Sequence, residues 1–434
     1  MDLLSKWNEL VREIPFSMRR DQANAMPEMV QALLQKHCQL WWDSDGPFPS
    51  FKRTCPPQDQ AAGEKKLSEL VDGLVYELKH IPQDDEARRK QGQRLREQGL
   101  AFASEVLNLE PKQIAFIESS GMLEASQEFA RRARAFNPGL PAEDIYQASR
   151  NVMTMNFIQL LLGLPVEITP AVFAYSMLYP YTDNYLDDPN ISPAVKLAFN
   201  HRFQQRLEGE DVRPANDHEA AISSLVEMIE TQWDRARFPQ VYDSLLAIHA
   251  AQIRSLSLVA PGAAPYELDV LGVSFEKGGT SVLADGYLAA GWLTPAQANL
   301  MFGYGAFTQL MDDLEDILQD QQEGRMTIFS QAARRWPLDS LTNRLFHFGR
   351  AIFADLSAFD SPAAGPLKEL IERSIDPLLI DSIGRVGQFY SKDYLRQLEQ
   401  HFPFRFSALR KQRERLDRQK VTLGRLVERF IIEA

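Results

Sequence analysis

The sequence contains little cysteine, no long hydrophobic run and no excess of positive charge. Its 434 residues include only Cys38 and Cys55, which are too few for a disulfide framework. No run of about 18 or more apolar residues occurs, so we predict no transmembrane segment. No signal peptide opens the chain, and we therefore expect a cytoplasmic protein.

Basic residues are outnumbered by acidic ones. The chain has 47 Lys and Arg against 59 Asp and Glu, which gives a formal net charge of −12. We therefore expect neither nucleic acid nor an anionic membrane as a partner. HExxH, CxxC, P-loop and GxSxG motifs are all absent, and the seven histidines are scattered. These absences exclude the metalloprotease, thiol redox, nucleotide triphosphatase and serine hydrolase sites that the motifs build.

Helical patterns fill most of the remaining sequence. Thr294 and Pro295 predict a helix start, as an N-cap and a first-turn proline. Apolar residues then recur at helical spacing, which indicates one buried face. These residues are Leu300, Gly303, Phe307, Leu310, Met311, Leu314, Ile317 and Leu318. A second, mostly polar face carries Gly305, Gln309, Asp312, Asp313, Asp316 and Asp320.

An earlier segment, 169–189, is built in the same way. Thr169 and Pro170 repeat the cap and proline, and Pro189 is expected to end the helix. One face carries Ser176, Tyr179, Asp183 and Asp187, with Asp188 beside them. Neighbouring carboxylates repel one another unless water screens them or cations lie between them. Each segment alone is compatible with a solvated acidic face, whereas two such helices in one chain favour a cation site.

Taken together, the two stretches resemble the all-α isoprenoid synthases, the superfamily of trans-prenyl diphosphate synthases and class I terpene synthases. Asp183, Asn184 and Asp187, with Asp188, stand where that family has its first DDxxD motif. The second motif is matched as Q-x-x-D-D-x-x-D by Gln309, Asp312, Asp313 and Asp316. Lys277 resembles the family's diphosphate-binding lysine, and Arg325 the basic residue after the second motif. The similarity spans roughly residues 142–391.

The resemblance implies a fold, a cofactor and a substrate. The fold would be an all-α, isoprenoid-synthase-type helical bundle around a central cavity. The acidic residues Asp183, Asp187, Asp188, Asp312, Asp313 and Asp316 would bind Mg²⁺, with three ions in the family. Lys277, Arg325, Gln309 and Arg150 would bind the diphosphate of an allylic prenyl substrate. The catalytic set implied is Asp183, Asp187, Asp312, Asp313, Asp316, Lys277 and Arg325.

A carbocation left by the departing diphosphate requires a dry cavity lined by aromatic faces. Candidates on the helices concerned are Phe157, Phe173, Tyr175, Tyr179, Phe275, Phe302 and Phe307. Aromatic residues at helical spacing also form ordinary cores, so either role is open for each of them. The sequence does not decide between a monomer and a homodimer.

Three readings of the activity remain. Chain-elongating synthases add a Gly-Lys-Arg-x-Arg segment and an Arg pair after the first motif, and neither is present here. Asn184 also replaces a family Asp. Retention of DDxxD in the second motif resembles class IB terpene synthases, and we predict a lyase that converts one prenyl diphosphate to a terpene hydrocarbon or alcohol. A prenyl diphosphate synthase or head-to-head prenyltransferase is the alternative, and a non-catalytic diphosphate-binding or scaffold bundle is the third reading.

We expect two regions, a helical N-terminal extension at 1–135 and an isoprenoid-synthase-like domain at 136–434. Arg150 would pair with a carboxylate or point at diphosphate. Arg202 and Arg206, at i and i+4, would bind an anion or pair with Glu208 and Glu210, and we favour pairing. Gly278 and Gly279 after Lys277 indicate a kink, a close approach to ligand or a helix crossing.

Overall fold

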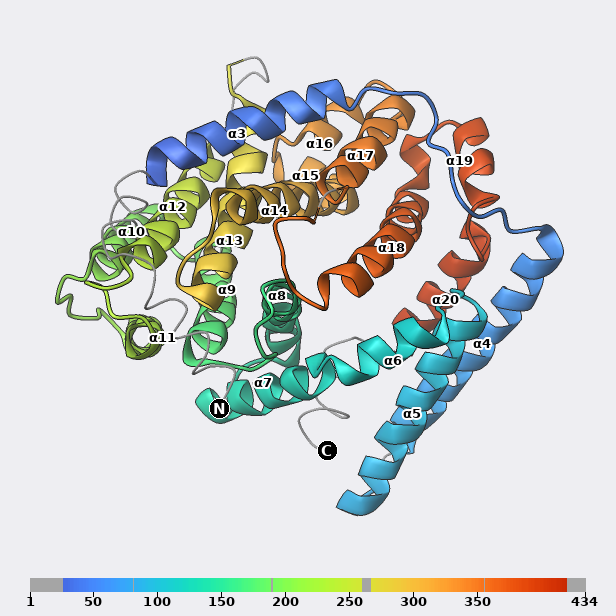
Figure 1. Cartoon of the computed structure of the whole chain (residues 1–434), viewed down its shortest axis with the longest axis horizontal. Coiled ribbons are helices and arrows are strands. Elements are labelled where there is room, and N and C mark those ends of the chain that lie inside the picture. The colour runs from blue at the N-terminus through green and yellow to red at the C-terminus, as the bar shows by residue number, and fades with distance from the viewer. Residues whose placement is uncertain (1–25, 81, 189, 260–266, 355, 420–434) are drawn as a thin grey trace. The chain divides into compact units, whose positions relative to one another are not determined.

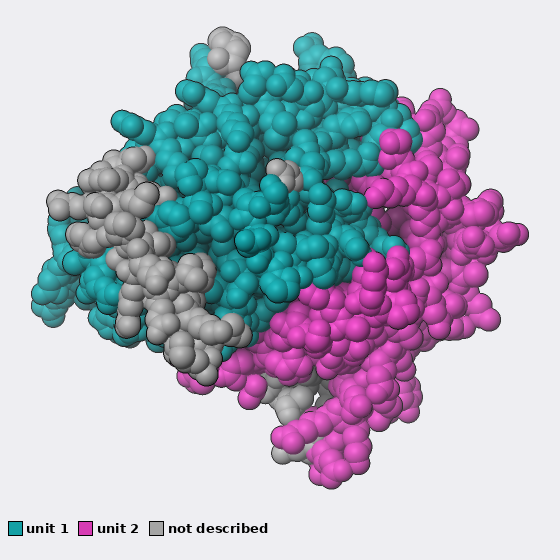
Figure 2. All heavy atoms as spheres, in the orientation of Figure 1, with its two compact units in different colours: residues 1–49, 151–375 teal, residues 50–150, 376–434 magenta. Residues whose placement is uncertain are grey.

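The computed structural model describes residues 26–80, 82–188, 190–259, 267–354 and 356–419 (Figure 1). Every regular element within these ranges is a helix, which confirms the predicted all-α class. None of the helices in the described ranges is long and apolar enough to cross a membrane. The chain forms two compact units, residues 1–49 with 151–375 and residues 50–150 with 376–434 (Figure 2).

The contacts therefore group the chain differently from the predicted boundary near residue 135. Helix α3 (Met26–Asp43) packs against α12, α13, α14 and α17 of unit 1, although it lies in the predicted extension. Its buried face includes Met26, Val30 and Trp41. The segment that does form a separate unit begins at residue 50 and is completed by the C-terminal part of the chain.

Unit 1 contains all the described residues of both acidic motifs. Besides α3 it comprises the end of α8 (Ala142–Leu161), α9 (Pro170–Asp187), α10 (Pro193–Glu208), α11 (Asp217–Gln232), α12 (Pro239–Ser255), η1 (Leu256–Val259), α13 (Val270–Ala290), α14 (Pro295–Glu315), α15 (Ile317–Glu323), α16 (Ile328–Ala332), α17 (Asp339–Ile352) and the start of α18 (Ala364–Arg385). Helix α13 is buried along almost its whole length, and it packs against α9, α12 and α14. It is the central helix of the unit.

Unit 2 joins segments that are far apart in the sequence. It comprises α4 (Pro57–Lys79), α5 (Asp85–Glu105), α6 (Pro111–Ser119), α7 (Met122–Phe136), the first part of α8, the end of α18, η2 (Gly387–Phe389), α19 (Lys392–Glu399) and α20 (Phe406–Arg418). The buried Gln60 amide donates to the carbonyls of Glu399 (2.7 Å) and Phe402 (3.0 Å). Glu64 pairs with Arg405 at 2.6 Å. These bonds tie α4 to the C-terminal segment.

The two predicted helix starts are confirmed. The Thr169 side chain caps α9 by accepting a hydrogen bond from the Val172 amide, and Pro170 follows in the first turn. Thr294 caps α14 in a capping box with Gln297. The helix expected to carry both faces through residue 320 is interrupted, because α14 ends at Glu315 and α15 begins at Ile317. Leu318, expected in the buried face, is 48% exposed because of this break.

The central helices α13 and α14 touch through their backbones. A Cβ atom at Gly278 would lie 2.3 Å from the Gly305 carbonyl oxygen, and one at Gly305 would lie 2.0 Å from the Gly278 oxygen. Both distances are far inside van der Waals contact. At Gly279, a Cβ atom would meet the Phe302 ring at 2.6 Å. The glycines after Lys277 therefore form a helix crossing, one of the predicted alternatives.

Replacing Gly278 by Ala should destabilise unit 1, because the backbones cannot separate without disturbing the packed core. We expect a loss of about 1–3 kcal/mol, the usual cost of overpacking. Chemical denaturation followed by circular dichroism measures it. Gly365→Ala is the control, since no atom lies within 4 Å of a Cβ there. Equal stability of the two variants would contradict a backbone contact at Gly278.

Candidate active site

The second acidic motif lies where α14 ends. Asp312 is half-buried, Asp313 is 5% exposed and Asp316 is the exposed C-cap residue. The Gln309 amide, one turn earlier, donates to Asp313 Oδ1 at 2.9 Å. The predicted i, i+4 spacing thus brings Gln309 and Asp313 into contact, and the carboxylates follow one another along the last turn.

Asp313 is the most constrained member of this motif. Burial raises the pKa of its carboxyl to about 6, and the neighbouring Asp312 carboxylate acts in the same direction. Gln309, Ser274 and Lys277 favour the ionised form and partly offset the effect of burial. Asp313 Oδ2 makes no hydrogen bond at ordinary length. The chain therefore holds an acidic oxygen in its interior without giving that atom a donor of its own.

The structure adds Asp320, which we had placed on the acidic face but not in the site. Its carboxyl is 4% exposed and accepts a hydrogen bond from the Thr327 hydroxyl at 3.3 Å. Burial, helped by the charges of Asp313 and Asp316, raises its pKa to about 7, with Arg325 and Thr327 opposing the shift. The signal in the sequence was its position four residues after Asp316, which continues the row of carboxylates through the break between α14 and α15.

Arg325 is brought to the same place by the turn after α15. Its Nε lies 3.6 Å from Asp320 Oδ1, and its side chain is about a quarter exposed. The Arg325 amide donates to the Asp320 carbonyl at 2.8 Å, and the Ser330 hydroxyl donates to the Arg325 carbonyl at 2.9 Å. Thr327 and Ser330 cap α16 reciprocally. Backbone and side chain are thus held by separate bonds, and the guanidinium stays beside the acidic row.

Lys277 reaches the row from α13. It is half-buried, directly precedes the crossing glycines, and lowers the pKa of Asp313 by its charge. Because α13 and α14 cross at Gly278 and Gly305, the ammonium-bearing turn and the acidic turn are held at a fixed separation. Lys277, Arg325, Asp313 and Asp320 therefore form one chain of charge interactions, and the diphosphate and metal roles assigned to Lys277, Arg325 and Asp313 stay predictions.

The first motif is placed by α9 and α12. The Gln252 amide on α12 donates to Asp183 Oδ1 at 3.3 Å. Helix α12 runs antiparallel to α13, since Gln240 bonds to the Gly291 carbonyl while Arg254 pairs with Glu276 at 2.5 Å. In this register Gln252 lies level with residues 277–278. Asp183 is consequently at the same end of unit 1 as Lys277.

The remaining residues of the first motif differ in their contacts and exposure. Asp188 caps the end of α9 and accepts hydrogen bonds from the backbone amide (2.8 Å) and side chain (2.9 Å) of Asn190. Its carboxylate is thus engaged in a local turn. Asn184 is exposed. The side chain of Asp187 lies outside the described residues, as does Pro189. The metal roles of Asp187 and Asp188 stay predictions.

The predicted cavity aromatics divide into two groups. Phe275 and Phe302 are fully buried, with Phe275 packed on Trp41 and Phe348 and Phe302 on His37. Such rings are core rather than cavity wall. Phe173, Tyr175 and Phe307 are also buried. Tyr179 is 36% exposed, one turn before Asp183, and Phe157 packs edge-on against Tyr304. Tyr179 and Phe157 are the better cavity candidates.

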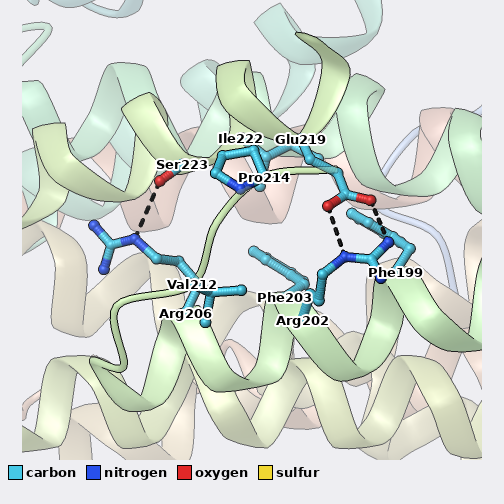
Figure 3. A pocket seen from close by; sticks show the side chains of 9 residues that line it. All are labelled: Phe199, Arg202, Phe203, Arg206, Val212, Pro214, Glu219, Ile222 and Ser223. Carbon is cyan, nitrogen blue, oxygen red and sulfur yellow. Dashed lines mark hydrogen bonds and ion pairs between the residues drawn. The ribbon is translucent and has the colours of Figure 1, made fainter. Parts of the chain in front are cut away.

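The structure places three arginines, Arg150, Arg202 and Arg206, outside this cluster. Arg150 is exposed and belongs to unit 2, so the structure does not join it to this cluster. Arg202 and Arg206 do pair with carboxylates, but the partners are Glu219 (2.6 Å) and Glu230 (2.7 Å) rather than Glu208 and Glu210. The pocket beside them is lined largely by apolar side chains (Figure 3). Both guanidiniums are already occupied, so this pocket is a poor anion site.

The acidic row suits a hard cation by donor type. Mg²⁺ prefers carboxylate oxygens and shares its coordination with water and substrate phosphate. The unpartnered Oδ2 of buried Asp313 is available as a ligand, and a cation would relieve the repulsion that Asp320 experiences. Within the described ranges, no three His, Cys, Asp or Glu side chains are grouped as a ready-made metal site. The row therefore offers ligands that still require substrate and water to complete a coordination shell.

Comparison with known proteins adds no relative. No protein-family model, curated protein or solved structure matches this chain. The assignment consequently depends on the residues themselves.

The stability of the protein should depend on pH through Asp320. Folding raises its pKa from 3.8 to about 7, so the folded state binds more protons between these values. The contribution of Asp320 to the free energy of unfolding is fully present below about pH 4 and is lost as the pH rises through 7. Asp320→Asn should therefore gain stability over wild type as the pH increases from 4 to 8, measured by thermal unfolding.

Glu323→Gln is the matched control, because Glu323 also lies 3.6 Å from Arg325 but is far more exposed. Its stability should follow the wild-type pH dependence. Parallel curves for Asp320→Asn and wild type would contradict a buried, charge-repelled carboxyl at position 320.

Proposed function

We propose that this chain is a magnesium-dependent class IB terpene synthase. It would ionise an allylic prenyl diphosphate and cyclise or rearrange the carbocation to a terpene hydrocarbon or alcohol. The observation that carries the proposal is the cluster of Asp313, Asp320, Lys277 and Arg325 at the end of α14, with Asp183 level with it on α9. Acidic and basic groups with this arrangement suit a metal-bound diphosphate.

Each charged group has a distinct task. Asp183, Asp312, Asp313 and Asp316 would hold Mg²⁺, which neutralises the diphosphate and improves it as a leaving group. Lys277 and Arg325 would donate charge-assisted hydrogen bonds to its oxygens. Asp320 keeps the Arg325 guanidinium beside the row through the 3.6 Å contact and is itself fixed by Thr327. Gln309 orients Asp313.

The hydrocarbon part of the substrate would extend away from these charges. Tyr179 lies on the face of α9 that also bears Asp183, and it is partly exposed. Its ring would stabilise a carbocation through its negative face and keep water away. Phe157 and Tyr304 form a second aromatic pair between α8 and α14, with ring centroids 5.6 Å apart.

Chain elongation is supported less well. It needs a second diphosphate site, and Arg202 and Arg206 are the first arginines after the first motif. Both are engaged by carboxylates, Arg202 by Glu219 in a two-point contact and Arg206 by Glu230. A second diphosphate would have to displace these bonds. A single-substrate reaction makes no such demand.

The direct test is incubation with Mg²⁺ and geranyl, farnesyl, geranylgeranyl or longer diphosphates, with and without isopentenyl diphosphate. We expect inorganic diphosphate and a terpene from one allylic substrate alone, detected by a phosphate assay and mass spectrometry. A longer diphosphate formed only with isopentenyl diphosphate would contradict the proposal and favour elongation. Absence of diphosphate release from every substrate would favour a non-catalytic bundle.

Asp316→Ala serves as the inactive comparison in that experiment. Loss of a ligand to a catalytic cation should lower turnover by a factor of about 10² or more, in the range seen when one transition-state stabilising group is removed. Glu315→Gln changes the adjacent acidic residue, which lies off the predicted ligand row, and should retain near wild-type turnover. Equal turnover in all three proteins would contradict the assigned site.

Tyr179 should influence substrate length. Replacing it by Ala removes an aromatic ring next to the charged cluster and enlarges the space available to the prenyl chain. We expect the kcat/KM ratio for a longer diphosphate over the best wild-type substrate to rise by about tenfold, which corresponds to about 1.4 kcal/mol. Phe275→Leu is the comparison, since that ring is core. An unchanged ratio for Tyr179→Ala would exclude a cavity role.

A further inference from the structure

A second carboxyl group is buried deep in unit 1, away from the acidic row. Asp285 on α13 is fully buried, and its Oδ1 accepts a hydrogen bond from the Asn151 amide on α8 at 3.1 Å. Its Oδ2 has no hydrogen-bond partner. No Lys or Arg of the described chain pairs with it. An interior carboxyl with one free oxygen and no counter-charge requires a physical explanation.

Asp285 lies on the polar face of α13 that begins at the proposed diphosphate site. The positions Ser274, Lys277, Ser281 and Asp285 are spaced by three, four and four residues, so they share one side of the helix. Ser274 and Lys277 both act on the Asp313 carboxyl. Eight residues separate Lys277 from Asp285, a rise of about 12 Å along the axis. The carboxyl is therefore at the far end of the polar face.

Polar groups of three other helices surround it. The Asn151 amide also donates to Ser176 Oγ on α9 at 3.2 Å. The hydroxyl of Tyr175, the residue before Ser176, donates to the Ser281 carbonyl at 3.4 Å. On α14, Tyr304 is close enough for the Asp285 charge to raise its pKa. Ser176 also lies two turns before Asp183 on the same face of α9. Polar faces of α9 and α13 thus connect the charged cluster with Asp285.

The interior favours the protonated form of this carboxyl. Burial raises the pKa of Asp285 well above its ordinary range, and the Asn151 hydrogen bond opposes that shift only in part. Because Asn151 donates to Oδ1, the acidic proton belongs on Oδ2, the oxygen without a partner. In its protonated form, Asp285 presents an O–H donor in the buried interior. Asn151 is positioned to stabilise the carboxylate if that proton leaves.

We propose that Asp285 exchanges a proton with the hydrocarbon part of the substrate, acting first as an acid and then as a base. The inference rests on the proposed terpene synthase function. It assigns the deep end of the polar face to proton transfer and the charged end to ionisation. Asn151 is a positioning residue, since it fixes which oxygen carries the proton.

The two steps balance. The released diphosphate first takes a proton from the initial carbocation, which leaves an uncharged polyene, and the π electrons of this polyene then take the proton from Asp285 Oδ2. The O–H bond breaks, its electron pair stays on Oδ2, and a new C–H bond leaves a carbocation beside the carboxylate. In the second step the carboxylate removes a proton from a carbon next to that cation. The C–H pair becomes a new π bond, and the acid is restored without any external reagent.

A purely structural role for Asp285 leads to a different prediction. If Asp285 only holds α8, α9 and α13 together through Asn151 and Ser176, its proton never reaches carbon. Deuterium from the solvent separates the two roles, because a carboxyl proton exchanges with water between turnovers and a carbon-bound proton does not.

The experiment is turnover of the best allylic diphosphate in D₂O by the full chain. Diphosphate release and the deuterium content of the product are both measured. We expect one deuterium on carbon in most product molecules from the wild type. Diphosphate release with no carbon-bound deuterium would overturn the role of Asp285 and leave the proposed function intact. No diphosphate release from any substrate would overturn the proposed function and this inference with it.

Asp285→Asn preserves shape and an acceptor for Asn151 but has no acidic proton. We expect diphosphate release within about fivefold of wild type and a product with less than a tenth of the deuterium, accompanied by the uncharged polyene. Asp243→Asn, at a half-buried carboxyl on α12 outside the site, should leave both values unchanged. Wild-type deuterium content in Asp285→Asn would overturn the proposal. If this variant does not fold, a wild-type product without carbon-bound deuterium still overturns the proposal.

Discussion

The backbone contact between α13 and α14 is the constraint on which the site depends. Two helices that touch at Gly278 and Gly305 cannot slide past each other, because any side chain at these positions would clash with a carbonyl. The position of Lys277 relative to Asp313 follows directly. The register of α12 against α13 is set separately, by the contacts of Gln240 with Gly291 and of Arg254 with Glu276, and it places Gln252 and hence Asp183 at the same level. The crossing and the α12 register together set the position of acidic and basic residues that come from three parts of the chain.

The acidic row is a source of instability that the rest of unit 1 tolerates. Asp313 and Asp320 are both almost inaccessible to solvent. Burial raises the pKa of both carboxyls because it disfavours the charged form. A chain selected for stability alone would replace such carboxylates or neutralise them internally. Here Lys277 and Arg325 compensate only part of the charge, and Asp313 Oδ2 makes no hydrogen bond of ordinary length. Incomplete compensation is the expected state of a site that is finished by a cation and an anionic ligand.

Helical periodicity and capping residues predicted the all-α class and the caps at Thr169 and Thr294, because each depends on residues within one or two turns. The break at Asp316 escaped prediction, since DDLEDILQD has no glycine or proline to mark it, and it exposed Leu318. The partners of Arg202 and Arg206 were wrong for a different reason. Local spacing favoured Glu208 and Glu210, whereas the packing of α11 on α10 brought Glu219 and Glu230 closer. Contacts between distant segments, such as Asn151 with Asp285, have no local signal.

The same residue type has opposite properties at the two ends of α13. Near Lys277, Asp313 and Asp320 lie among other charged groups. A bound cation would keep these carboxylates ionised, and the cation could in turn bind an anionic ligand. Eight residues further, the hydrogen-bond partner of Asp285 is the neutral Asn151 amide, and burial without a counter-charge raises the pKa of its carboxyl. Pairs of acidic groups whose surroundings separate their pKa values are a common way to divide charge stabilisation from proton transfer. The polar face of α13 would allow one substrate to reach both groups, with its charged end at one and its hydrocarbon end at the other.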